Sequence, residues 1–95
     1  MARNEDIDLG IEWVLLTNSA VASVVAVNKG PNIALLMATN GTNPPSNNDE
    51  DGIPIDPRIG VLTLTLSEMF PGVSGADRLY GRAQGGTTKI FVSHA

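Results

Sequence analysis

Apolar and polar residues alternate along several short stretches of the chain. In residues 61–66, Val-Leu-Thr-Leu-Thr-Leu, the leucines fall on one face of an extended chain and the threonines on the other. This period of two predicts a half-buried strand. Other short apolar stretches that end at turn-forming residues lie at 11–16, 20–27, 32–39, 78–83 and 87–92. Six or seven short strands without a helix-length period of 3.6 predict an all-β fold, a small β-sandwich or jelly-roll.

Local signals predict how some of these stretches are joined. Gly85-Gly86 separates two predicted strands and indicates a hairpin. Residues 53–55 form at most a short edge strand, because Pro54 and Pro57 have no N–H to donate to a sheet ladder. The segment Ser-Glu-Met-Phe-Pro at 67–71 is typical of a single helical turn at a corner of the sandwich.

Two stretches, 20–27 and 32–39, are apolar on both faces, whereas a sandwich strand normally turns one face to solvent. In the first of them Val21, Val25 and Val27 fall on one side, and small residues, mostly alanine, fall on the other. Two interpretations are open at this point. Either a terminal arm covers the outer face of these strands, or that face meets another subunit.

The size of the chain leaves it with a modest core. A domain of 95 residues buries roughly 60–65% of the surface that its unfolded form exposes. The sequence has no cysteine, so neither a disulfide nor a thiolate metal site adds to its stability. We expect a flexible N-terminal arm at residues 1–10, a single β-sandwich domain at 11–95, and stabilisation by partner subunits.

The charge balance argues against general nucleic-acid binding. Ten acidic residues against six basic ones give a net charge of −4, and a phosphate backbone attracts the opposite balance. The N-terminal residues are polar and acidic, so we expect no secretory signal. The longest apolar stretch, 20–27, is far shorter than the ~20 residues of a membrane helix. We therefore expect synthesis in the cytoplasm and no membrane contact.

The acidic, proline-rich run at 44–57 resembles a calcium loop in its first six matching positions. The twelfth position of that pattern needs a glutamate that closes the coordination sphere, and Arg58 stands there instead. We interpret the run as an exposed loop between strands that contacts a partner through Asp49, Glu50 and Asp51. Whether these three acids also bind a cation weakly is left open.

No segment provides a complete catalytic site. Gly81–Thr88 has the glycine spacing of a phosphate-binding loop, but Thr87 stands in the place of the lysine. Gly72–Ala76 approaches a nucleophile elbow, but Ala76 replaces its last glycine. The only histidine, His94, is next to last and is expected to fray. We expect no enzyme activity, no cofactor, no metal and no small-molecule substrate.

Polar and aromatic side chains gather on one face of the predicted strand at 78–83. Arg78, Tyr80 and Arg82 share this face, which is either solvated or an interface hot spot. The single tryptophan, Trp13, is interpreted as a core anchor, with stacking on a sugar ring as the alternative.

Four features follow one another along the chain in a distinctive order. They are a tryptophan-bearing first strand, Val-Asn-Lys-Gly-Pro at 27–31, Pro-Pro-Ser at 44–46, and Leu-Tyr-Gly-Arg-Ala-Gln-Gly-Gly-Thr-Thr-Lys-Ile-Phe-Val-Ser at 79–93. In this order the chain, from residue 11 onward, resembles the small all-β virion proteins of tailed bacteriophages, especially capsid decoration or cement proteins. The resemblance implies a β-sandwich or jelly-roll that trimerises and ties neighbouring major capsid proteins together, with the N-terminal arm as a lattice contact.

The resulting hypothesis is a structural virion protein, a capsid decoration subunit that stabilises a phage head. Its expected partners are the major capsid protein and further copies of the chain in a homotrimer, and its expected location is the capsid surface. The alternative is a receptor- or glycan-binding β-sandwich module of a tail fibre or head spike. The residues assigned to the subunit or capsid interface are Ile7, Leu9, Val21, Val25, Asp49, Glu50, Asp51, Arg78, Tyr80 and Arg82.

Overall fold

The computed structural model describes residues 3–40, 52–57, 61–62 and 65–94 of the chain. Within these ranges it contains eight strands and one short helix. In chain order they are β1 (Arg3–Leu9), β2 (Val14–Leu15), β3 (Val25–Asn28), β4 (Ala34–Thr39), β5 (Ile53–Ile55), β6 (Val61–Leu62), α1 (Leu66–Met69), β7 (Arg78–Ala83) and β8 (Thr88–His94).

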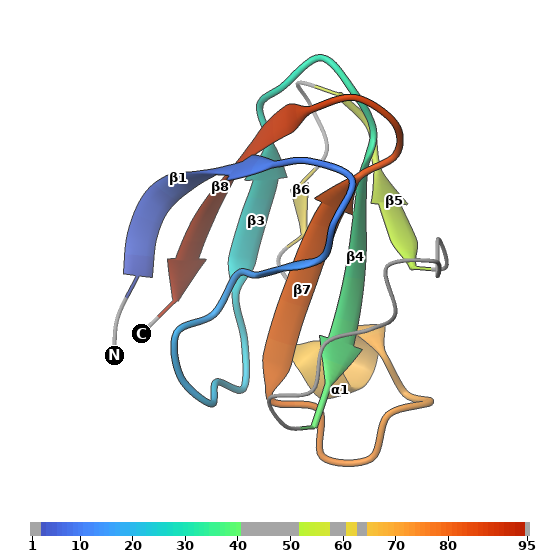
Figure 1. Cartoon of the computed structure of the whole chain (residues 1–95). Coiled ribbons are helices and arrows are strands. Elements are labelled where there is room, and N and C mark those ends of the chain that lie inside the picture. Colours follow the sequence, from blue (N-terminus) through green and yellow to red (C-terminus); the bar gives the residue numbers. More distant parts are fainter. Residues whose placement is uncertain (1–2, 41–51, 58–60, 63–64, 95) are drawn as a thin grey trace.

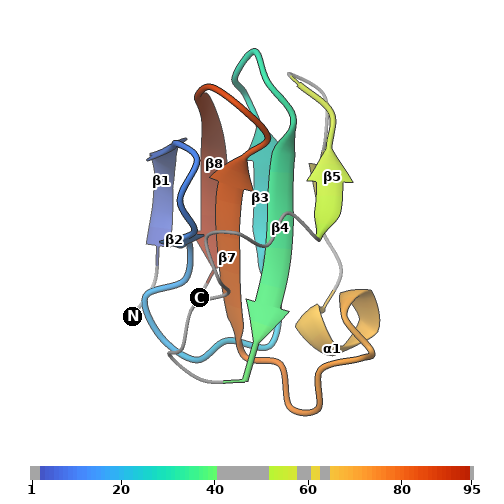
Figure 2. The ribbon, with the colours of Figure 1, turned by 45° about the vertical axis from the view of Figure 1, so that its right-hand side comes forward.

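The strands form two four-stranded sheets that face each other as the layers of a sandwich (Figures 1 and 2). One sheet, called here the β8 sheet, has the order β1-β8-β3-β6, and the other, the β7 sheet, has the order β2-β7-β4-β5. Every neighbouring pair is antiparallel. The prediction of an all-β fold, a small β-sandwich, is therefore confirmed.

The core lies between the inward faces of the two sheets. Alternate residues of β8, such as Ile90 and Val92, are completely buried there, and Leu36 and Leu79 reach the same cluster from the β7 sheet. A period of two places such residues on one side of each strand. Each fully buried Leu or Ile side chain contributes about 1.5–3 kcal/mol relative to an exposed one, so this cluster supplies the main driving force for folding.

The N-terminal segment corrects one prediction. Residues 1–10 were expected to be a flexible arm, but Arg3–Leu9 form β1, which pairs with β8 along its whole length, from Arg3 opposite His94 to Leu9 opposite Thr88. The cause is an alternation hidden among the charges: Ile7 and Leu9 point toward the core cluster, while Asp8 between them is exposed. The same pairing corrects the expected fraying of His94, which is buried at the end of β8.

The glycine pair at 85–86 forms a turn, but not the predicted hairpin. β7 pairs with β2 and β4, and β8 pairs with β1 and β3, so the chain crosses from one sheet to the other at this turn. Gly85 and Gly86 have φ values of 81° and 71°, a left-handed conformation that costs glycine little. Glycine chemistry thus predicts a tight reversal of the chain but not which sheets the reversal connects.

The remaining strand predictions were right in type and shifted in extent. β5 is a three-residue strand at the edge of its sheet, as its prolines require. In the stretch 61–66, Val61–Leu62 form β6, and Leu66 begins α1, the predicted single helical turn, which opens one residue earlier than expected. The stretch 20–27 becomes regular strand only at Val25, preceded by a single bridge between Ser23 and Thr65.

Candidate functional site: the outer face of the β8 sheet

The outward side of the β8 sheet carries an apolar stripe, formed by Val25 and Val27 of β3 and Phe91 of β8. Val27 lies directly opposite Phe91, and Val25 lies opposite Ser93. Opposed residues of an antiparallel pair point to the same side of the sheet, and Ala26 and Val92 between them are buried in the core. Val25 is 38% exposed, and Val27 and Phe91 are half-buried. Within the described residues, Val25 and Ile11 are the exposed large apolar side chains.

Charged pairs flank this apolar stripe at one end. The Nζ atom of Lys29 lies 2.9 Å from an Asp6 carboxylate oxygen, and the Nζ atom of Lys89 lies 3.7 Å from Asp8. All four side chains are substantially exposed, so each pair contributes little to stability. An apolar centre with a polar, solvated border is the usual anatomy of a protein interface.

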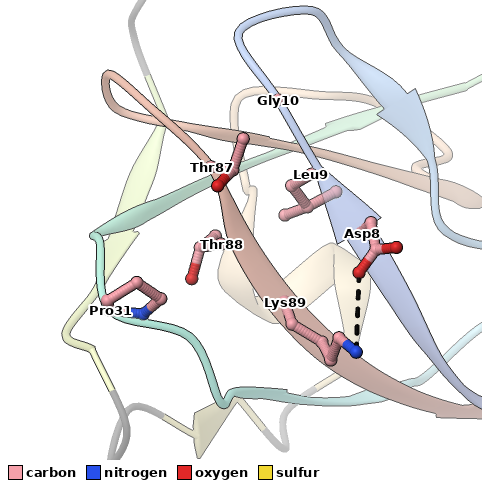
Figure 3. Close-up of a pocket in the computed structure, with 7 residues that line it drawn as sticks. All are labelled: Asp8, Leu9, Gly10, Pro31, Thr87, Thr88 and Lys89. Carbon is pink, nitrogen blue, oxygen red and sulfur yellow. Dashed lines mark ion pairs between the residues drawn. The ribbon is translucent and has the colours of Figure 1, made fainter.

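A shallow pocket of about 450 Å³ adjoins these charges (Figure 3). It lies where β1 leaves the β8 sheet, and its lining residues are Asp8, Leu9, Gly10, Pro31, Thr87, Thr88 and Lys89. Several of its polar groups are already engaged: Lys89 faces Asp8, and the Thr88 hydroxyl donates to Asn28 Oδ1 at 2.8 Å. The pocket therefore offers a recess beside the charged border and not a prepared set of reacting groups.

The wall of this pocket is fixed by a buried asparagine. Asn28 donates through Nδ2 to the carbonyl oxygens of Asn32, at 2.8 Å, and of Ile55, at 2.9 Å. Its Oδ1 accepts from the backbone N–H of Gly30 at 3.2 Å as well as from Thr88. Gly30 packs so closely on Thr88 that a side chain there would collide with it. Because Ile55 belongs to β5, these bonds also join the two sheets.

The outer face of the β7 sheet is built differently. Leu35, Tyr80 and Trp13 form a second apolar cluster there, separate from the core, and each is less than a tenth exposed. The guanidinium of Arg82 lies 5.6 Å from the centre of the Trp13 ring, a cation–π contact. The same cluster accounts for the second apolar face of the stretch 32–39.

The residues predicted to form an interface fall into different environments. Leu9 is buried in the core, and Ile7 and Val21 pack against it. Val25 is exposed on the apolar stripe. Arg78 forms an ion pair with Asp77 at 3.1 Å, whereas Tyr80 and Arg82 are only 3% and 6% exposed, so a solvated face is wrong for these two. Asp49, Glu50 and Asp51, with most of the acidic run, lie outside the described residues.

Sequence reasoning missed Phe91 and the two lysines of this surface. The signal was available in β8, where Thr88, Ile90 and Val92 alternate with Lys89, Phe91 and Ser93. This alternation does not show which strands are neighbours, because the pairing of β8 with β1 and β3 joins segments far apart in the sequence.

Two further observations bear on function. Among the described residues, no group of three or more His, Asp or Glu side chains is placed to hold a metal ion. No helix in that part of the chain is long and apolar enough to cross a membrane. Comparison of the chain with models of protein families, with curated proteins and with solved structures found no match.

Proposed function

We propose that this protein is a non-enzymatic structural subunit of a phage particle, a capsid decoration protein that acts as a closed oligomer. The observation that carries the proposal is the apolar stripe of Val25, Val27 and Phe91 on the outer face of the β8 sheet. A decoration subunit requires complementary surface and closed symmetry, and it requires no reacting group.

The position of β1 narrows the interpretation of the apolar stripe. One interpretation of the doubly apolar stretch 20–27 was that a terminal arm covers its outer face. Arg3–Leu9 instead extend the sheet sideways, beyond β8. We infer that a second subunit covers Val25 and its neighbours, and this is the contact that we assign to the oligomer.

The alternative function, glycan binding by stacking, loses its principal support. It requires an exposed Trp13 or Tyr80, and both rings are buried in the second cluster. A sugar ring stacks on an aromatic face that solvent can reach. The decoration hypothesis needs neither ring at the surface, since its contacts come from the opposite sheet.

The test is co-sedimentation of the purified protein with heads of the phage whose genome encodes it. We expect saturable binding to assembled heads and none to the free capsid protein. Val25→Asp should weaken binding about tenfold or more, because a carboxylate on the apolar stripe costs upwards of about 1.4 kcal/mol at the subunit contact that holds the oligomer together. Gln84→Asp, an exposed site on the turn between the sheets, is the matched control and should bind normally. Non-saturable binding, or equal binding by both variants, would contradict the proposal.

A further inference from the structure

The four sheet edges of the sandwich are not alike. The edge strands β2 and β6 have two residues each, and β5 has three with Pro54 at its centre. Short edges and edge prolines are common means of preventing further strand pairing. The fourth edge strand, β1, has seven residues and no proline. Among the described strands, β1 therefore forms the one long edge on which an additional strand has room to pair.

The hydrogen bonds of β8 show which backbone groups of β1 face this open edge. The carbonyl of Lys89 accepts from the N–H of Lys29, on the β3 side. Backbone groups of successive residues in a strand point to opposite sides, so Thr88, Ile90 and Val92 turn theirs toward β1. Their partners Leu9, Ile7 and Glu5 turn toward β8. The N–H and C=O groups of Asn4, Asp6 and Asp8 consequently point to the free edge.

The side chains along this edge select the kind of strand that fits. Glu5, Asp6 and Asp8 of β1 each have a cationic partner in the chain, namely Arg3, Lys29 and Lys89, and the Asp8 contact is the longest of the three. The Asp8 side chain is 87% exposed, and its distance of 3.7 Å from Lys89 marks a weak pair that an incoming cation can replace. A second copy of β1 fits poorly, because antiparallel pairing centred on Asp6 sets that carboxylate against its own copy.

We propose that β1 is a docking edge for an extended, lysine- or arginine-bearing segment of a partner protein, which adds to the β8 sheet as a further antiparallel or parallel strand. Main-chain hydrogen bonds to Asn4, Asp6 and Asp8 supply affinity, and the exposed carboxylate of Asp8 supplies the preference for a basic sequence. This inference stands on the edge of the sheet, whereas the proposed oligomer uses its outer face, so either can hold without the other.

The test uses the full-length protein and a capped peptide of alternating lysine and valine, followed by amide hydrogen exchange and ¹⁵N chemical shifts. Without peptide, we expect the amides of Asn4, Asp6 and Asp8 to exchange freely, and those of Ile7 and Leu9 to be protected. Saturating peptide should protect the first three. The matched peptide with glutamate in place of lysine should not bind. No saturable binding, equal binding of the two peptides, or protection elsewhere would overturn the proposal.

Substitution at the centre of β1 provides an independent check. Asp6→Pro removes one N–H that points to the free edge and none that points to β8, so we expect the fold to survive and the affinity for the lysine peptide to fall about tenfold. Asp6→Asn keeps that N–H and should lose less affinity. Thermal unfolding of both variants establishes whether they are folded; if Asp6→Pro is not, the exchange pattern of the unmodified protein decides. Unchanged affinity in a folded Asp6→Pro protein would refute the docking edge.

Discussion

The outer faces of the two sheets differ in solvent exposure, although the strands that form them have a similar apolar pattern. β3 and β4 both come from stretches that are apolar on two sides. On the β7 sheet, Leu35 of β4 is 3% exposed within the second cluster. On the β8 sheet, Val25 of β3 is 38% exposed on the apolar stripe. An apolar outer face therefore does not by itself indicate an interface, because the chain's own residues cover one of these two faces.

We expect the largest effect on stability at Asn28. This residue of β3 forms hydrogen bonds inside the protein, whereas Val25 and Val27 of the same strand lie on its outer face. Asn28→Ala removes four hydrogen bonds, two given and two received. At about 1 kcal/mol each, with buried carbonyls left unsatisfied, we expect a loss of about 4 kcal/mol in the free energy of unfolding. Urea unfolding measures it. Asn32→Ala loses one exposed bond, to the carbonyl of Thr87, and is the control; equal losses in the two variants would contradict the assigned role.

Leu35 and Val25 test the comparison itself. Leu35→Ala should lower the free energy of unfolding by about 2–3 kcal/mol, because a buried side chain is removed although it lies on an outer face. Val25→Ala should change it by about 0.5 kcal/mol or less when the protein is dilute enough for the midpoint to be independent of concentration. Chemical denaturation of both variants provides the measurement. Similar losses would show that the two outer faces are equally covered.

The charged border of the apolar stripe should have the smallest effect. Lys29→Ala breaks the ion pair between Lys29 and Asp6, whose side chains are 49% and 37% exposed, respectively. We expect this change to lower the free energy of unfolding by about 0.5 kcal/mol or less. The same difference should shrink further at high salt, since exposed charges are screened. Thermal unfolding at two ionic strengths checks both statements. A loss above 1 kcal/mol would mean that this border stabilises the monomer and is not reserved for a partner.

The fold class could be predicted from local pattern, because the fold class depends on strand and turn signals that lie within each short stretch. The alternation at 78–83, the prolines of β5 and the helical turn after Thr65 are all legible within a few residues. Where a prediction failed, a distant partner decided the outcome. The glycine pair at 85–86 joins two sheets because β7 pairs with β4 and β8 pairs with β1, so the two strands do not pair with each other.

The candidate surface was harder to predict than the fold. Val25 was named from its position in an apolar stretch, and the structure places it on the exposed stripe. Tyr80 and Arg82 were named from the polar and aromatic face of the strand at 78–83, and they are buried. The difference lies in Trp13, which lies just before β2, remote in sequence from β7, and packs against their face. Only the three-dimensional neighbours distinguish the two cases.

The most direct test of the central claim is the native mass of the protein by light scattering, measured over about a hundredfold dilution. The account predicts a closed oligomer, a trimer by the resemblance to decoration proteins, whose mass stays constant over most of that range. It also predicts that Val25→Asp yields a folded monomer, because the carboxylate interrupts the apolar stripe that joins the subunits. A protein that is strictly monomeric at the highest concentration, or a Val25→Asp variant that assembles normally, would contradict the claim.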